Sequence, residues 1–310
     1  MTLLSKIQNL PLAFGGASIS GEGAGYGFGS INESESIDLL HEAYDLGIRI
    51  YDTAPIYGFG LSEQRIGKAF KQNRDKVFYV SKSGVTWHEN KRVDMNNDPK
   101  IVVKMLEQSL RDLDSDYIDL YMVHWPDSKF DIRKTLEPII KAQEQGKIKH
   151  IGLCNTNVDE LLKSAEVAKI EVVQSQFNFF DTGAKEDLFP YLDKNQISFM
   201  SWGTLDKGIL TKRVDANRKF DENDCRSWAP WWKAQDFKSK FEVVEKLYPI
   251  VSSEGYTLTE FAIGFNLSFK TITTPICGAR NSEQLKDLIK SVKHLPSTEL
   301  INKIVEKLKS

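Results

Sequence analysis

Short apolar runs alternate with longer amphipathic stretches along almost the whole chain, and this alternation limits the possible folds more than any other feature. Continuous apolar runs of this kind are typical of strands that are buried on both faces, whereas apolar residues three or four positions apart indicate helices. The runs predict strands at 10–14, 48–51, 77–81, 118–123, 148–153, 172–176, 197–201 and 271–275.

Amphipathic segments lie between these runs, and the first of them has clear ends. Asn32 and Glu35 stand at the spacing of a capping box, apolar residues follow at helical spacing, and Gly47 marks the end of the helix. The other segments predict helices at 62–72, 99–113, 133–146, 158–168, 186–195 and 282–292. This α/β alternation predicts an all-parallel sheet closed into an (α/β)8 TIM barrel, with a doubly wound open sheet as the alternative.

The chain has 310 residues, a length that fits either two average domains or one α/β barrel. No Pro-rich linker, change of composition or low-complexity tract divides it, so we expect a single barrel domain over residues 1–310. That domain would carry a long loop after the seventh strand, at 203–236, and a helical segment at its C-terminus. The loop is too long for a plain connector, which favours a lid or a substrate loop.

A glycine-rich stretch follows the first strand at 15–29. It lacks the GxGxxG dinucleotide fingerprint, because Tyr26 stands where a third glycine would follow Gly21 and Gly23. We therefore expect a mobile loop over the mouth of the barrel.

Charge and cysteine content exclude several classes of protein. The chain has 41 basic and 43 acidic residues and no block of like charges, which argues against nucleic-acid and membrane partners. The 3 cysteines are far apart and the histidines lack ligand spacing, so neither a disulfide framework nor a metal site is expected. The sequence shows neither a signal peptide nor a membrane span, so we expect a soluble cytoplasmic protein. It leaves the oligomeric state open and slightly favours a monomer.

Polar side chains stand where three successive predicted strands end. Asp52 follows the second strand, Lys82 the third and His124 the fourth. Tyr57 comes shortly after Asp52. Each alone has an ordinary structural reading, but burying Asp and Lys is costly unless they pair. Because chemistry in a barrel takes place at the carboxyl ends of the strands, we expect these four residues to meet at one mouth.

This set of residues suits the reduction of a carbonyl group. A tyrosine ordinarily has a pKa of about 10, and a neighbouring cation favours its phenolate, so we expect Lys82 to lower the pKa of Tyr57. Tyr57 would then deliver a proton to the carbonyl oxygen, which His124 would orient. Asp52 would hold Lys82 in place, and a hydride donor would have to lie alongside.

Seven segments, in order along the chain, resemble the aldo-keto reductase superfamily over nearly its whole length. They are YDTAPIYGFGLSEQRIGKAF (51–70), YVSKSG (79–84), YIDLYMVHWPD (117–127), GKIKHIGLCN (146–155), VVQSQFN (172–178), SWGTLDKGILT (201–211) and ICGARNSEQL (276–285). The resemblance implies a barrel that transfers hydride from a nicotinamide cofactor, typically NADPH, to aldehydes and ketones without a metal. It implies Tyr57 as the general acid, with Asp52, Lys82 and His124 as its partners.

The resemblance also implies which residues would bind the cofactor. Asn155 and Gln174 would hold the nicotinamide carboxamide, and Trp202 would stack on the nicotinamide ring. The others would be Leu205, Gly208 and Leu210 along the pyrophosphate, and Gly278, Ala279, Arg280, Gln284 and Asp287 around the adenosine phosphate.

Three positions depart from the family pattern. Cys154 stands where a serine is common, and a thiol is the weaker hydrogen-bonding group, so carboxamide binding would rest on Asn155 and Gln174. Gln284 stands where many relatives have a second basic residue, and Leu288 where an asparagine is frequent near the adenine. We therefore expect a moderate preference for NADPH, with NADH possible.

Further tryptophans predict an aromatic-lined pocket for a small-molecule carbonyl substrate, with core packing as the alternative. They are Trp87, Trp125, Trp228, Trp231 and Trp232. Stacking would suit an aromatic carbonyl or the apolar face of a sugar, and the sequence does not choose between them.

Three functions are compatible with these features. The first is an NADPH-dependent reductase of an aldehyde or ketone. The second is an NAD(P)-linked aldose or alcohol dehydrogenase that runs the same chemistry in reverse. The third is a redox-sensing binding module similar to potassium-channel β-subunits, which share this fold and cofactor site, although nothing in the sequence marks a partner surface.

Overall fold

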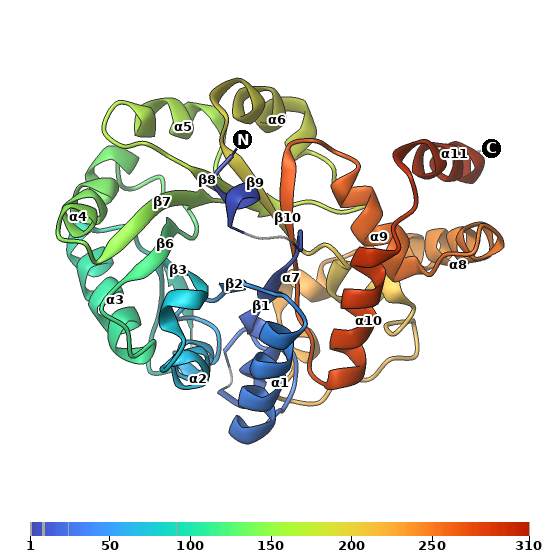
Figure 1. Cartoon of the computed structure of the whole chain (residues 1–310), viewed down its shortest axis with the longest axis horizontal. Coiled ribbons are helices and arrows are strands. Elements are labelled where there is room, and N and C mark those ends of the chain that lie inside the picture. The colour runs from blue at the N-terminus through green and yellow to red at the C-terminus, as the bar shows by residue number, and fades with distance from the viewer. Residues whose placement is uncertain (1, 8–9, 24, 91, 310) are drawn as a thin grey trace.

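The computed structural model describes residues 2–7, 10–23, 25–90 and 92–309. Eight strands of these residues pair in parallel as a closed barrel, which Figure 1 shows end-on with helices around it. In barrel order they are β1 (Ala13–Gly15), β10 (Ile272–Cys277), β9 (Ser198–Trp202), β8 (Val172–Gln176), β7 (Ile148–Cys154), β6 (Ile118–Val123), β3 (Phe78–Ser83) and β2 (Ile50–Asp52). Because β1 pairs with both β2 and β10, the predicted barrel is confirmed and the open sheet is excluded.

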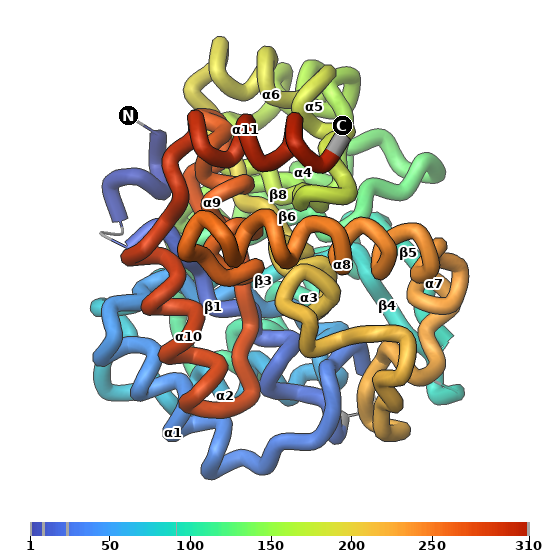
Figure 2. The backbone as a smooth tube through the Cα atoms, turned by 90° about the vertical axis from the view of Figure 1, so that its right-hand side faces the viewer, coloured from blue at the N-terminus to red at the C-terminus, as the bar shows by residue number. Residues whose placement is uncertain are grey.

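The outer layer consists of helices, and the predicted ends of the first one are confirmed. Asn32 Oδ1 accepts a hydrogen bond of 2.9 Å from the Glu35 N–H, and Gly47 ends the helix with a φ of 107°. The helices are α1 (Glu33–Asp45), α2 (Leu61–Phe70), α3 (Pro99–Asp112), α4 (Ile132–Glu144), α5 (Val158–Ala165), α6 (Ala184–Asn195), α7 (Pro230–Lys233), α8 (Phe237–Ser253), α9 (Leu258–Leu267), α10 (Ser282–Lys293) and α11 (Thr298–Lys309). Figure 2 shows α11, the predicted C-terminal helical segment, packed beside α8.

Two local features differ from the sequence prediction. The first strand begins at Ala13 rather than at residue 10 and is only three residues long. A small antiparallel hairpin of β4 (Val85–Trp87) and β5 (Val93–Met95) follows β3 and lies outside the barrel sheet. The hairpin was not predicted because its charged, partly exposed residues lack the apolar alternation by which strands are recognised.

Apolar side chains fill the inside of the barrel. A short N-terminal 3-10 helix, η1 (Leu4–Lys6), closes the end at which the strands begin, which we call the lower end. Leu4 belongs to this interior cluster, and its N–H donates to Ser198 Oγ at 3.1 Å. In Figure 1, η1 lies across the middle of the barrel. With its lower end closed, the barrel leaves the carboxyl ends of the strands as the accessible mouth.

The two long connections that the sequence predicts lie together at this mouth. Segment 203–236 contains η5 (Asp206–Thr211), η6 (Cys225–Ser227) and α7, and the Cys225 N–H donates to the Gly27 carbonyl at 2.9 Å. Gly27 belongs to the glycine-rich stretch, of which Ala24 lies outside the described residues. Among the helices that the structure describes, none combines the length and apolar character needed to cross a membrane.

Candidate active site

A buried ion pair joins two neighbouring strands at the mouth. Lys82 of β3 is fully buried, and its Nζ donates to Asp52 Oδ1 at 2.7 Å and to the Thr53 carbonyl at 2.9 Å. Asp52 ends β2, which pairs with β3 in parallel register. The close contacts compensate for the desolvation of both charges, and they hold the ammonium group in one place.

Tyr57 and His124 lie against this ion pair. Lys82 Nζ is 5.3 Å from the centre of the Tyr57 ring. The rings of Tyr57 and His124 stand edge to face, with centres 6.0 Å apart. His124 follows β6 directly, and its N–H donates to the Ser83 carbonyl at 2.8 Å. The structure therefore brings together all four residues that the strand ends predicted.

Burial and charge act on these groups in opposite directions. Burial lowers the pKa of Lys82, but Asp52 outweighs it and holds that pKa above its ordinary value. Burial raises the pKa of Tyr57 to about 12, although Lys82 opposes this rise. The pKa of His124 lies well below its ordinary value, because the ring is desolvated and faces the Lys82 cation. At neutral pH the site therefore holds a charged lysine, a protonated tyrosine and a neutral histidine.

The pKa of Tyr57 differs from the sequence prediction. We expected Lys82 to bring the pKa of Tyr57 below its ordinary value, but burial of the hydroxyl exceeds the effect of the cation. The sequence showed which charge stands beside the tyrosine and could not show how deeply the hydroxyl is enclosed.

Hydrogen bonds connect the next polar residues to the same site. Gln174 of β8 donates from Nε2 to Asp52 Oδ1 at 2.8 Å, so it supports the ion pair directly. Asn155 donates from Nδ2 to the His124 carbonyl at 2.9 Å and accepts from Trp202 Nε1 at 3.0 Å. Of the three residues expected around the nicotinamide, Gln174 thus contacts the ion pair, and Asn155 and Trp202 are linked by hydrogen bonds to His124. Their roles toward a cofactor stay predictions.

Cys154 belongs to the apolar cluster inside the barrel. Its Sγ lies 3.6 Å from Met122 Sδ and 3.7 Å from Gln174 Oε1, and the residue is fully buried. Burial also raises the pKa of this thiol. The departure from the family pattern therefore places a neutral sulfur next to Gln174.

The residues expected along the pyrophosphate have different environments. Leu205 is partly buried where the chain enters η5, and Gly208 has a φ of 102°. The Leu210 side chain is fully buried in the core, so only its backbone could face a ligand. Ala279 is also buried, and a Cβ on Gly278 would come within 2.7 Å of Ser18 Cβ.

Arg280 and Gln284 form a small unit at the start of α10. Gln284 Oε1 accepts from the Arg280 N–H at 3.0 Å, and Arg280 Nη2 donates to the Ser30 carbonyl at 2.9 Å. Asp287 is paired elsewhere, with Arg213 at 3.2 Å. The guanidinium group therefore donates to a neutral carbonyl and not to the carboxylate of Asp287.

The predicted substrate tryptophans do not all lie together. Tyr26 of the glycine-rich stretch packs against Trp228 and Trp231, with ring centres 5.5 Å and 6.5 Å apart. Trp125 lies edge-on to Trp202 at 6.5 Å. These five rings, three of them predicted pocket residues, belong to segments at the mouth.

The other two predicted residues have different neighbours. Trp87 belongs to the β4–β5 hairpin and packs against Phe59 at 5.0 Å. Trp232 is only 5% exposed and packs against Phe220 and Phe237, under the start of α8. Trp232 is therefore a core residue, which is the alternative that the sequence left open for the tryptophans.

Sequence reasoning missed two basic residues at the mouth. Lys207 lies within η5, with its Nζ 5.4 Å from the ring centres of both Trp202 and Trp231. Arg226 donates from Nη1 to the Lys207 carbonyl at 2.7 Å. A charged residue soon after a predicted strand could have pointed to Lys207, but no local pattern relates it to Arg226, 19 residues further on.

Comparison with known proteins identifies the chain. The sequence profile of the aldo/keto reductase family matches residues 11–309. The chain belongs to the aldo/keto reductase family. Members of this family are NAD(P)H-dependent oxidoreductases that act on small carbonyl compounds, so the resemblance seen in the sequence is confirmed.

This aldo/keto reductase is similar to proteins from bacteria and yeast. It is 33% identical to an aldo-keto reductase of Bacillus subtilis over 264 residues, which cover 84% of this chain and 80% of the relative. It is 25% identical to the NADH-specific methylglyoxal reductase of Escherichia coli, with 84% and 83% covered. The structure of the glycerol dehydrogenase of Gluconobacter oxydans superposes on this chain with a TM-score of 0.83 at 27% identity. The match covers 99% of this chain and 95% of the dehydrogenase chain.

Features of the mouth fit a bound nicotinamide dinucleotide. Arg280 Nε is buried and has no hydrogen-bond partner among the described residues, although a guanidinium group readily binds phosphate. Asn155 offers amide groups next to His124. In the part of the chain that the structure describes, no three His, Cys, Asp or Glu residues are grouped to hold a metal ion.

Proposed function

We propose that this aldo/keto reductase reduces a small aldehyde or ketone to an alcohol, with NADPH as the preferred cofactor. The observation that carries the proposal is the buried Lys82–Asp52 pair in contact with Tyr57 and His124 at the accessible end of the barrel. When bound, the cofactor supplies the hydride, and the residues of the chain supply the proton and the orientation.

Tyr57 is the proton donor in this proposal. Its raised pKa keeps the hydroxyl protonated at neutral pH, so the acid is loaded before the substrate arrives. As the proton leaves, Lys82 stabilises the phenolate that forms, because its ammonium group is held next to the ring. Asp52 keeps Lys82 charged and fixed, and Gln174 fixes Asp52.

His124 orients the carbonyl oxygen. A neutral imidazole next to Lys82 can donate one hydrogen bond without adding a second positive charge to the site. Asn155 would hold the carboxamide of the nicotinamide, and Trp202 would lie against the nicotinamide ring. Asn155 also positions His124, because its Nδ2 donates to the His124 carbonyl.

The preference for NADPH rests on Arg280. Its guanidinium group donates to the neutral carbonyl of Ser30, and among the described residues its Nε has no hydrogen-bond partner, so the group has donor capacity for the 2′-phosphate. A yeast relative, 28% identical to this chain, is an NADP(+) enzyme, and the Escherichia coli relative is NADH-specific. We expect Arg280→Ala to weaken NADPH binding by about 10- to 100-fold and leave NADH binding nearly unchanged. Titration of wild type and Arg280→Ala with NADPH and NADH measures these affinities. Equal losses of affinity for the two cofactors would contradict the assignment.

A dehydrogenase that oxidises an alcohol or aldose is the second candidate. Similarity to the glycerol dehydrogenase of Gluconobacter oxydans favours it, because the same proton donor can act as a base in reverse. A panel of aldehydes, ketones, sugars and polyols, followed by nicotinamide absorbance in both directions, separates the two functions. If the chain turns over none of these compounds with either cofactor, the proposed function is wrong.

We also propose a single-domain, monomeric protein of the cytoplasm. The three cysteines that the structure describes are free and buried, which fits a reducing compartment.

A further inference from the structure

A second buried carboxyl lies directly behind the strand that carries Lys82. Glu63 is the third residue of α2 and is fully buried, and its Oε1 accepts a hydrogen bond of 2.6 Å from Ser81 Oγ. Successive side chains of a strand point to opposite faces. Val80 of β3 belongs to the apolar cluster inside the barrel, so Lys82 shares that face and Ser81 faces the helices. Glu63 is therefore bonded to the neighbour of Lys82, on the other side of the sheet.

The same turn of α2 also holds the segment of Tyr57. The Ser62 N–H donates to the Tyr57 carbonyl at 3.2 Å, and Ser62 Oγ accepts from Thr53 Oγ1 at 2.8 Å. The Thr53 carbonyl is itself a partner of Lys82 Nζ. Ser62 and Glu63, adjacent in the chain, thus join the segment of the proposed proton donor to the strand of its cation.

Polar groups from β3, α3 and β6 surround the carboxyl. Among the described residues, four buried polar atoms have no hydrogen-bond partner, namely Glu63 Oε2, Ser83 Oγ, Ser109 Oγ and Tyr121 OH. The first three residues act on the pKa of the Tyr121 hydroxyl, which burial raises above its ordinary value, so all four lie together. Hydroxyl groups can donate or accept, so this cluster can accommodate the carboxyl in either protonation state.

The elements packed on α2 differ in the charge that they direct toward Glu63. Lys82 of β3 favours the ionised carboxyl, whereas Asp112 of α3 opposes it. Tyr121 of β6 faces it with a neutral hydroxyl. The 3-10 helix η2 (Gly16–Ile19), which also contacts α2, contains no titratable side chain.

The carboxyl changes its charge near neutral pH. Burial raises the pKa of Glu63 to about 7, although its serine neighbours and Lys82 oppose this rise. The remaining neighbour, α1, presents Glu33, which pairs with the exposed Lys68 at 2.6 Å. An ionised Glu63 would offset part of the positive field that Lys82 directs at the proposed proton donor, and would disfavour the phenolate that forms as the proton leaves.

We propose that Glu63 is a positioning residue that makes carbonyl reduction sensitive to pH. Its neutral carboxyl holds the strand of Lys82 against the segment of Tyr57, and its ionisation slows proton delivery by Tyr57. The inference rests on the proposed function, because it concerns the proton donor of the same site. Glu63 acts through Ser81 and Lys82, from behind the sheet, and contacts neither cofactor nor substrate.

Single-turnover reduction measures the step that Tyr57 performs. Wild type loaded with NADPH is mixed with the aldehyde that it reduces fastest, and nicotinamide absorbance is followed at pH values on both sides of neutrality. The wild-type rate constant should fall by about 3- to 10-fold through a midpoint near pH 7, the order expected for one added charge in the protein interior. Glu63→Gln should keep the rate of the acid side throughout, because an amide still accepts from Ser81 but does not ionise.

Ser81→Ala tests the same titration from the other side of the hydrogen bond. The variant keeps the ionisable carboxyl of Glu63 and removes its donor. Because this donor favours the ionised form, the midpoint of the rate profile should move to higher pH.

Glu260 provides a matched control. It is also the third residue of its helix, α9, and is also buried. Burial raises the pKa of Glu260, but hydrogen bonds from Thr257 and His294 outweigh burial and hold that pKa below its ordinary value. Glu260→Gln should therefore leave the shape of the rate profile as in wild type. Circular dichroism of each variant separates a local effect from misfolding.

Infrared absorption of the protonated carboxyl gives a readout that needs no turnover. The band of Glu63 should disappear from wild type as the pH rises through about 7, and it should be missing from Glu63→Gln at every pH. Ser81→Ala and Lys82→Met should both move its midpoint to higher pH, since each removes a group that favours the ionised form.

Three outcomes would overturn the inference. These are the same pH profile in wild type and Glu63→Gln, a rate that Glu63→Gln lowers equally at every pH, and an infrared midpoint that Lys82→Met leaves unchanged. The second outcome would make Glu63 a purely structural residue of α2. If wild type reduces no carbonyl compound, the proposed function fails, and the infrared titration then decides whether Glu63 and Lys82 are coupled.

Discussion

The two ends of the barrel each carry a buried ion pair, and the pairs differ in what surrounds them. At the mouth, Lys82 and Asp52 lie against the phenol of Tyr57 and the imidazole of His124. At the lower end, Arg74 pairs with Asp119 at 2.7 Å. The first pair lies beside a phenol and an imidazole at the accessible mouth, whereas the second lies among Lys149 and the rings of Tyr79 and Tyr117 at the opposite end.

Most polar groups of the lower pair have partners on neighbouring segments. Arg74 also donates to Ser115 Oγ and to the carbonyls of Val77 and Tyr117, at 2.7 to 3.0 Å. Asp119 also accepts from the Tyr79 N–H at 2.9 Å. These interactions join β3, β6 and their flanking turns, and Lys149 of β7 adds a further contact to Asp119 at 3.0 Å, which indicates a role in stability.

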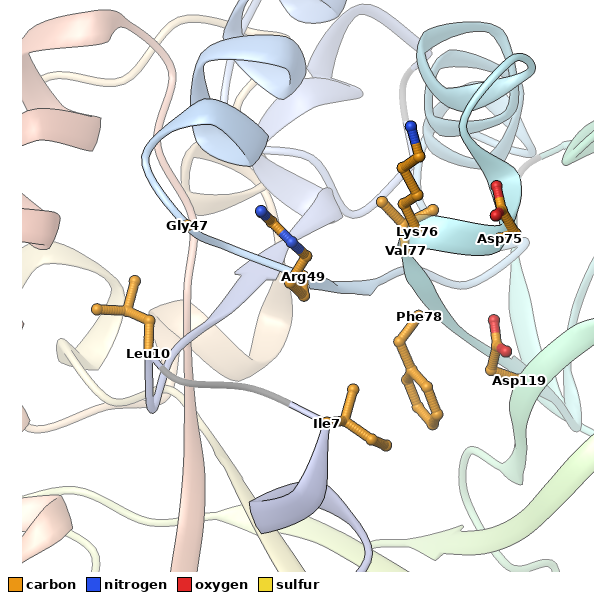
Figure 3. Close-up of a pocket in the computed structure, with 9 residues that line it drawn as sticks. All are labelled: Ile7, Leu10, Gly47, Arg49, Asp75, Lys76, Val77, Phe78 and Asp119. Carbon is orange, nitrogen blue, oxygen red and sulfur yellow. The ribbon is translucent and has the colours of Figure 1, made fainter.

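A hollow next to the lower pair shows that an open space alone does not mark an active site. It has a volume of about 550 Å³, and Figure 3 shows Arg49, Lys76 and Asp119 among its lining residues. Arg49 donates to the carbonyls of Tyr44 and Ile48, at 2.6 Å and 2.8 Å. Buried charges support chemistry only where neighbouring groups are left able to react.

Removal of Asp119 should have the largest effect on stability. Asp119→Ala leaves the mostly buried Arg74 without its carboxylate, so the free energy of unfolding should fall by about 3–5 kcal/mol. Activity per folded molecule should be retained. Denaturant unfolding measures the loss, with Glu33→Gln as the control, because the exposed Lys68–Glu33 pair contributes at most about 1 kcal/mol. Similar losses in both variants would show that the lower pair has no special role.

Tyr57→Phe should lower activity and not stability, which is the converse of Asp119→Ala. The ring and its packing stay, but the proposed proton donor is lost, so kcat for carbonyl reduction should fall by at least ~10²-fold. Stability and NADPH affinity should change little. Steady-state kinetics and a cofactor titration measure both properties. Turnover close to that of wild type would remove Tyr57 from the mechanism.

Glu63 of α2 lies between the two ends of the barrel, and its titration offers a third test. It is fully buried behind β3, accepts from Ser81 Oγ at 2.6 Å, and burial raises its pKa to about 7. Because the pKa is higher in the folded than in the unfolded state, the contribution of this carboxyl to stability is complete below about pH 4.5. It is lost as the pH rises through about 7.

Glu63→Gln should remove this pH dependence. Relative to wild type, the variant should gain up to about 2–3 kcal/mol in the free energy of unfolding between pH 5 and pH 8. Unfolding curves at both pH values measure the difference. A constant difference between the two proteins would show that Glu63 does not titrate in this range.

Among the four substitutions in this comparison, Trp202→Ala should have the smallest effect. If the indole stacks on the nicotinamide, its loss should weaken NADPH binding by about 1–2 kcal/mol and remove part of the fluorescence quenching. Equal quenching in wild type and variant would show that the ring does not contact the cofactor.

Sequence alone was sufficient for the architecture and for the four residues at the mouth. The runs at 118–123 and 172–176 match β6 and β8, because strands buried on both faces must be continuously apolar. Asp52, Lys82 and His124 could be placed together because parallel strands end at the same side of a barrel. The hairpin at 85–95 was missed because its exposed residues carry no such pattern.

Tertiary structure alone decided the electrostatics and the partners of these residues. The pKa of Tyr57 depends on how closely the fold encloses its hydroxyl, and Gln174 contacts Asp52 from a strand 122 residues away. Lys207 faces Trp231 because Arg226 holds its backbone in a left-handed turn. Local sequence determines which groups reach the mouth, since strand direction follows from pattern. Their protonation and contacts depend on distances between segments that are remote in the chain.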